Sequence, residues 1–125
     1  MENEKLKLKA EMLSKEIKEK KKELRKVYKQ MELEEKVKYE GVIIFNENVS
    51  VKHLRDFETN LKHNIEVLNT EHLGLRHLAY EIQGCKEGYY FKYEFISNVK
   101  GINKLETLLR QNKDVLKFME VKMED

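Results

Sequence analysis

The sequence has 125 residues, enough for one domain with an appendage, and 40% of them are hydrophobic, which suffices for a core. Charged residues make up 38%, but the net charge of +2 is too small to indicate nucleic-acid binding by itself. Cys85 is the single cysteine and no long apolar run occurs, so the sequence predicts neither a disulfide framework nor a membrane-spanning helix.

Residues 1–38 are predicted to form a long amphipathic helical arm. They contain no Gly or Pro, and their 13 Lys/Arg and 9 Asp/Glu give a net charge of +4. Their apolar residues recur at alternating spacings of four and three, the spacing of a coiled-coil seam. The seam comprises Leu6, Ala10, Leu13, Ile17, Lys20, Leu24, Val27 and Met31. Two interpretations stay open: a solvated, frayed helix, or a seam that packs against a partner helix or RNA.

The pattern changes at residue 39, where a strand, a helix and a second strand are predicted. Residues 41–45 form a short apolar run that ends in a polar turn. Ser50 suits the N-cap of an amphipathic helix that ends at Asn64. Residues 65–82 then predict the second strand.

Within that strand, Gly74 indicates a bulge or a bend that turns the following side chains to a new face. We expect this bend to present Arg76 and His77 at a surface. The apolar residues that follow are expected in the core, and they are Leu78, Tyr80 and Ile82.

The second half predicts a strand, a helix and a last strand. Residues 83–88 form a loop with two glycines, and residues 89–95 alternate aromatic with other side chains, which is typical of a half-buried strand. Ser97 or Asn98 caps the next helix, and residues 115–121 form the final strand.

The order of elements predicts an α+β fold: a long N-terminal α-helix, then a ferredoxin-like β-α-β-β-α-β domain. Its two helices cover one face of a four-stranded antiparallel sheet. The domains are predicted as residues 1–38, the helical arm, and residues 39–125. The other face of the sheet would carry Tyr90 and Lys92 and stay available to a partner.

Motifs for catalysis or cofactor binding are missing from the sequence. It contains neither a phosphate-binding glycine motif nor a CxxC pair, and none of its four histidines stands near a carboxylate cluster. Ser14, Ser50 and Ser97 lack a nucleophile-elbow context, and Cys85 lies in a loop without an obvious base. We therefore expect no enzyme activity, no cofactor, no metal and no small-molecule substrate.

Residues 74–82 closely resemble the signature of the bacterial-type ribosomal protein S6 family, roughly Gly-x-Arg/Lys-polar-Leu-Ala/Ser-Tyr-x-Ile. Gln83, which follows, departs mildly from the basic residue usual in the family. Residues 38–40 resemble the basic-Tyr-Glu start of the family's first strand. Residues 88–90 resemble its Gly-Tyr-Phe/Tyr element, and residues 114–122 its last strand.

The resemblance covers residues 38–123 and implies a structural component of the small ribosomal subunit that binds small-subunit ribosomal RNA together with ribosomal protein S18. It implies RNA contacts in the bent strand and at strand ends, and these candidates are Arg76, His77, Lys38 and Lys122. Tyr90 and Lys92 would lie on the surface that contacts S18 or RNA. Many members have an aromatic residue where Lys92 stands.

Family members usually begin close to their first strand, so the arm is an addition. Added terminal helices occur in organellar ribosomal proteins, which favours the mitochondrial matrix over the bacterial cytoplasm. The arm would then contact other ribosomal proteins or RNA. The alternative function is a coiled-coil adaptor whose ferredoxin-like domain is a protein-interaction module.

Overall fold

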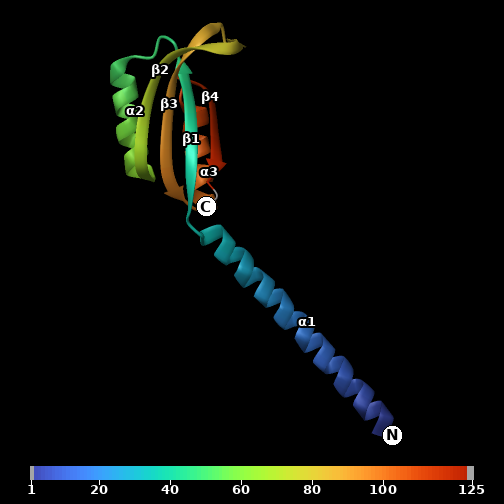
Figure 1. The fold of residues 1–125 in the computed structure, drawn as a ribbon. Coiled ribbons are helices and arrows are strands. Elements are labelled where there is room, and N and C mark those ends of the chain that lie inside the picture. The colour runs from blue at the N-terminus through green and yellow to red at the C-terminus, as the bar shows by residue number, and fades with distance from the viewer. Residues whose placement is uncertain (1, 124–125) are drawn as a thin grey trace. The chain divides into compact units, whose positions relative to one another are not determined.

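The structure is a computed structural model that describes residues 2–123, and at residues 2, 32 and 33 it describes the backbone alone. The chain divides into a helical unit, residues 1–34, and a mixed unit, residues 35–125. Figure 1 shows a long helix followed by a unit of strands and helices. In chain order the elements are α1 (Glu2–Glu34), β1 (Val37–Asn46), α2 (Val51–Asn64), β2 (Glu66–Ile82), β3 (Cys85–Ser97), α3 (Val99–Gln111) and β4 (Val115–Lys122).

The helical unit is the single helix α1, which confirms the predicted N-terminal helix. Its sequence consists mainly of Lys, Glu, Leu and Met, residues with high helix propensity. Near its C-terminal end, the Gln30 side-chain amide donates a hydrogen bond of 2.7 Å to Glu34. All described side chains of α1 are exposed, so this unit by itself buries no apolar face.

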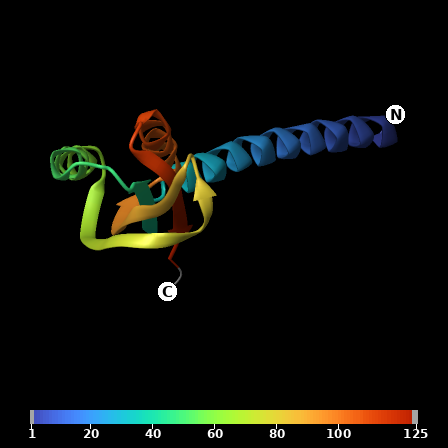
Figure 2. The same cartoon turned by 90° about the horizontal axis from the view of Figure 1, so that it is seen from above.

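The mixed unit is a four-stranded antiparallel sheet in the order β2-β3-β1-β4. The central pair, β1 and β3, stays in register from Val37 opposite Ser97 to Asn46 opposite Gly88. Figure 2 shows α2 and α3 together on one face of the sheet. The predicted ferredoxin-like β-α-β-β-α-β fold and its long N-terminal helix are therefore confirmed.

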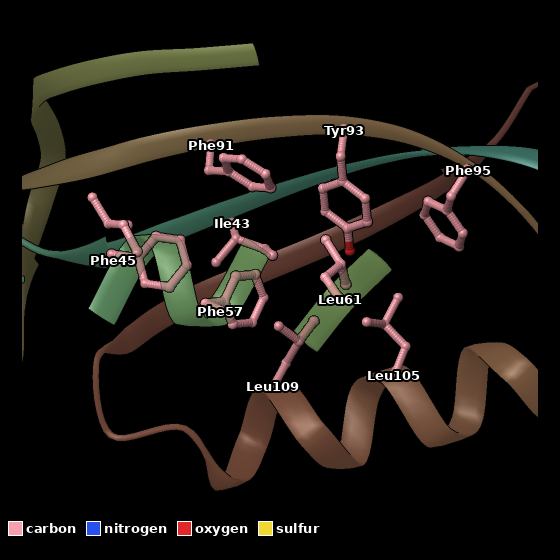
Figure 3. Packing of buried hydrophobic residues seen from close by; sticks show 10 residues of the cluster. Ile43, Phe45, Phe57, Leu61, Phe91, Tyr93, Phe95, Leu105 and Leu109 are labelled. Carbon is pink, nitrogen blue, oxygen red and sulfur yellow. The ribbon is translucent and has the colours of Figure 1, made fainter. Parts of the chain in front are cut away.

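The core lies between the sheet and the two helices. Figure 3 shows the alternate aromatic side chains of β3 pointing toward α2 and α3. These rings stack along the strand, with centroids 5.8 Å apart for Phe91 and Tyr93 and 5.0 Å apart for Tyr93 and Phe95. Each fully buried side chain of this size contributes about 1.5–3 kcal/mol to folding. The buried cluster comprises Ile43, Phe45, Leu54, Phe57, Leu61, Phe91, Tyr93, Phe95, Leu105 and Leu109.

Polar side chains cap both helices of the mixed unit. The Ser50 hydroxyl accepts a hydrogen bond of 3.1 Å from the backbone N–H of His53, which confirms the predicted cap of α2. Of the two residues considered for α3, the structure selects Asn98, whose side-chain oxygen accepts from Gly101 N–H at 2.8 Å. Ser97 instead donates to the carbonyl of Asn98.

One row across the sheet combines a glycine, a tyrosine and a glutamate. Gly41 of β1 lies between Tyr93 of β3 and Glu120 of β4. A methyl group at residue 41 would overlap the Tyr93 ring and come within 2.7 Å of its hydroxyl oxygen. The Tyr93 hydroxyl and one Glu120 oxygen are buried without a hydrogen-bond partner among the described residues. Burial raises the pKa of both groups, and the charge of Glu106 raises that of Glu120 further.

We expect Gly41→Ala to lower the free energy of unfolding by about 1–3 kcal/mol, because the new methyl group overpacks the interior against Tyr93. Chemical denaturation measures the loss. In a double-mutant cycle, Tyr93→Leu removes the ring atoms that clash, so the combined loss should be smaller than the sum of the single losses. Additive losses would show that the overlap is not the cause.

We expect Glu120→Gln to raise the free energy of unfolding at neutral pH by about 1 kcal/mol or less, because it removes a poorly solvated charge. The folded domain holds the Glu120 proton more tightly than the unfolded chain does. Stability therefore falls as pH rises above the ordinary carboxyl pKa of 4.5 and through the raised pKa of the folded state.

Denaturation curves across this pH range measure the effect, and Glu120→Gln should flatten the fall. Glu66→Gln changes an exposed carboxylate at the start of β2 and is the matched control. A less stable Glu120→Gln protein at neutral pH would contradict this account.

Candidate nucleic-acid interface

The bend predicted in the second strand is confirmed. Gly74 has a φ of +82°, a backbone conformation that favours glycine, and the pairing of β2 with β3 shifts register between His72 and Gly74. Beyond the bend, the end of the β2–β3 hairpin curls across the end of the sheet in Figure 1. Tyr80 of β2 thereby meets Lys117 of β4, on the opposite edge of the sheet, with their side-chain N and O atoms 3.4 Å apart.

The expectation that Tyr80 belongs to the core is wrong, because 63% of this residue is exposed. The hairpin end lies beyond the part of the sheet that the helices cover, so its side chains meet solvent and one another. Leu78 and Ile82 are half-buried and lie outside the core cluster. The Leu78 side chain lies beside Gly88, because a Cβ atom added at residue 88 would be 3.3 Å from its Cδ2 atom. Leu78 therefore packs within the hairpin and Tyr80 against Lys117 of β4, and neither belongs to the main core.

Upstream of the bend, a hydrogen-bonded network anchors β2 to α2. His72 Nε2 lies 3.1 Å from Glu58 Oε2, and His72 Nδ1 lies 2.8 Å from the Tyr89 hydroxyl. The Thr70 hydroxyl donates to the other oxygen of Glu58 at 3.0 Å. Burial opposes ionisation of Glu58, but the bonds from Thr70 and His72 outweigh it and lower the pKa of this carboxyl. The network fixes the strand immediately before Gly74.

Arg76 and His77 are both exposed, but the structure does not bring them to one face. Arg76 pairs in the ladder with Gly88 and His77 with Glu87, and consecutive residues of a strand point to opposite sides. The imidazole Nε2 of His77 lies 3.6 Å from a carboxylate oxygen of Glu87. Among the described residues, Arg76 forms no ion pair, so its guanidinium keeps all its donors.

Lys92 and Tyr90 lie on the open face of the sheet, as expected from their alternation with the buried aromatic residues. Lys92 is already engaged there: its ammonium donates to Glu40 at 2.9 Å. This hydrogen bond raises the pKa of the Lys92 ammonium, and the charges of Glu71 and Glu94 add to the effect. The local surface around Lys92 is therefore acidic, which a basic partner would complement.

Lys38 and Lys122 lie at strand ends but on opposite faces of the sheet. Lys122 is opposite Tyr39, whose ring stacks on the core residue Phe95, and Lys38 is the neighbour of Tyr39 on the same strand. The Lys38 ammonium lies 3.5 Å from a carboxylate oxygen of Glu94. The structure therefore does not gather the six candidate residues into one patch.

Sequence reasoning missed the carboxylates that neutralise the candidate lysines. Glu40 and Glu94 occupy alternating positions that suggest the open face, yet only the register of β1 against β3 places each beside a lysine. It also missed the contact between Tyr80 and Lys117, which no spacing in the sequence signals. Within residues 2–123, no cluster of His, Cys, Asp and Glu suits a metal ion. No helix in the described part of the chain is long and apolar enough to span a bilayer.

The chain is similar to known ribosomal proteins. It is 36% identical over 86 residues to the small ribosomal subunit protein bS6 of Azobacteroides pseudotrichonymphae, an alignment that covers 65% of this chain and 77% of that protein. It is 39% identical over 92 residues to bS6 of Helicobacter pylori, covering 74% and 56% of the two chains.

A solved structure has the same fold. The crystal structure of 30S ribosomal protein S6 from Thermotoga maritima matches with a TM-score of 0.65 at 21% identity, covering 71% of this chain and 89% of that one. The family model described as Ribosomal protein S6 matches residues 38–122, the whole sheet-containing part, and does not extend into α1. On these grounds the chain belongs to the ribosomal protein S6 family.

Proposed function

We propose that this protein is a structural component of the small ribosomal subunit, in which residues 39–125 bind small-subunit ribosomal RNA together with ribosomal protein S18. Membership of the family supports the assignment, and both curated relatives carry the name of a small ribosomal subunit protein. The role is one of binding and assembly rather than catalysis. The predicted arm of residues 1–38 is shorter in the structure, where α1 ends at Glu34 and residues 37 and 38 belong to β1. Helix α1 forms a separate arm in this proposal.

The observation that carries RNA binding is the unpaired Arg76 on the bent hairpin. Its guanidinium has no carboxylate partner among the described residues and lies two positions beyond the Gly74 bend. A guanidinium donates in a fork to phosphate, and RNA is recognised largely through its shape, sugars and phosphates. His77 is secondary because Glu87 lies beside it, and Lys122 is a peripheral contact.

The charge of the domain supports a joint interface with a basic protein. Residues 39–125 have a net charge of −2, which disfavours RNA binding by the domain alone. On the open face, Lys38 and Lys92 are each paired with a glutamate, so neither lysine offers RNA a free positive charge. It suits a protein partner better, with Tyr90 as an aromatic contact. We assign that partner surface to S18.

The contacts of the arm and the compartment in which the protein works remain predictions. Residues 1–34 hold 11 Lys/Arg and 8 Asp/Glu, a net charge of +3, and would contact other ribosomal proteins or RNA within the particle. An added helix of this kind favours a mitochondrial ribosome over a bacterial one.

In a sucrose gradient that separates the ribosomal subunits, we expect the tagged full chain to sediment with the small subunit. The experiment requires a host in which this chain replaces the resident S6 protein. Recovery only from the free-protein fractions would overturn the proposed function.

We expect Arg76→Ala to weaken binding of the full chain, in the presence of S18, to small-subunit RNA by about 1–3 kcal/mol, because a charged hydrogen bond to phosphate is lost. Filter binding at fixed salt measures the affinity. Arg55→Ala, which removes the same charge from an exposed position of α2, is the matched control and should leave the affinity unchanged. Equal losses of affinity in the two variants would show that Arg76 contributes only through its positive charge and makes no specific contact.

A further inference from the structure

Helix α1 carries an apolar seam that its own unit leaves exposed. The six large apolar members of the seam are 51–64% exposed, and they are Leu6, Leu13, Ile17, Leu24, Val27 and Met31. Ala10 and Lys20 complete the seam and are exposed as well. The family match begins at residue 38 and so does not include this helix. An exposed apolar stripe of this length indicates an interaction surface.

We infer that α1 pairs with α1 of a second copy of this chain, as a parallel two-stranded coiled coil in register. The seam residues alternate at spacings of four and three, which keeps one stripe of the helix facing a partner over its whole length. The 33 residues of α1 span about 50 Å at 1.5 Å per residue, which accommodates more than three heptads. The inference concerns α1 alone and does not depend on RNA binding by the domain.

The charges beside the seam select the partner and its direction. Glu16 precedes the seam residue Ile17, and Lys21 follows the seam residue Lys20. In a parallel pair in register, the residue just before one seam position faces, in the other copy, the residue five positions later in the sequence. Glu16 of each copy therefore faces Lys21 of the other. In the antiparallel alignment that superposes the whole seam, Glu16 would instead face Glu23 of the second copy, twice. Self-complementarity therefore favours the parallel arrangement.

Lys20 fixes the register and limits the strength of the pair. In register, the two Lys20 side chains share one layer, where their long stems let the ammonium groups reach water. An alignment shifted by one heptad would put each lysine against Leu13 or Val27 and disturb two layers instead of one. A single polar position of this kind specifies register at a cost in stability. The dimer is accordingly moderate in affinity and reversible.

The test is sedimentation equilibrium of the full chain from low to high micromolar concentration, without RNA. We expect a monomer–dimer equilibrium, and circular dichroism should show helix content rising with concentration. Lys20→Leu should tighten the dimer. A chain that stays monomeric throughout would overturn the inference.

Charge reversal tests the direction. Glu16→Lys should weaken the dimer by about tenfold, because two attractive contacts with Lys21 become repulsive. Combining it with Lys21→Glu should restore the affinity. Glu11→Lys makes the same charge change on the face away from the seam and is the matched control. If Glu16→Lys tightened the dimer, the parallel arrangement would be overturned, because the new ammonium would then face Glu23.

Discussion

The mixed unit depends on the pairing of β1 with β3 and on the space that Gly41 leaves in it. The aromatic side chains of β3 can form a continuous stack only because the Tyr93 ring lies over a residue without a Cβ. The stack in turn forms an apolar surface on one face of the sheet, and α2 and α3 pack against it. The same row carries Glu120, so the tight packing of this core includes a charge that is poorly solvated.

The exposed hairpin depends on a different glycine. Strand β2 bends at Gly74. Just before the bend, hydrogen bonds among His72, Glu58 and Tyr89 hold the strand against α2 and β3. The bend follows directly after this anchor, at a residue whose positive φ is accessible to glycine without strain. The backbone of Arg76 is placed beyond the bend by its pairing with Gly88, without an ion pair of its side chain among the described residues.

The surfaces of the domain differ in how their charged side chains are paired. On the open face, Lys38 and Lys92 are each paired with a glutamate, and Glu71 adds negative charge beside Lys92. Arg76 on the hairpin carries a positive charge without an ion-pair partner among the described residues. Such a distribution fits a protein that joins an assembly through several partners, each held by a different surface. The arm adds one surface that is complementary to itself.

The sequence by itself determined the element order, the ferredoxin-like fold, the cap at Ser50 and the bend at Gly74, because periodicity, capping and glycine conformation are local properties. The tertiary structure alone decided which charges are paired, since the register of β1 against β3 puts Glu40 beside Lys92. It also decided that Tyr80 lies outside the core. Sequence patterns report that a side chain is apolar, whereas burial depends on which part of the sheet the helices reach.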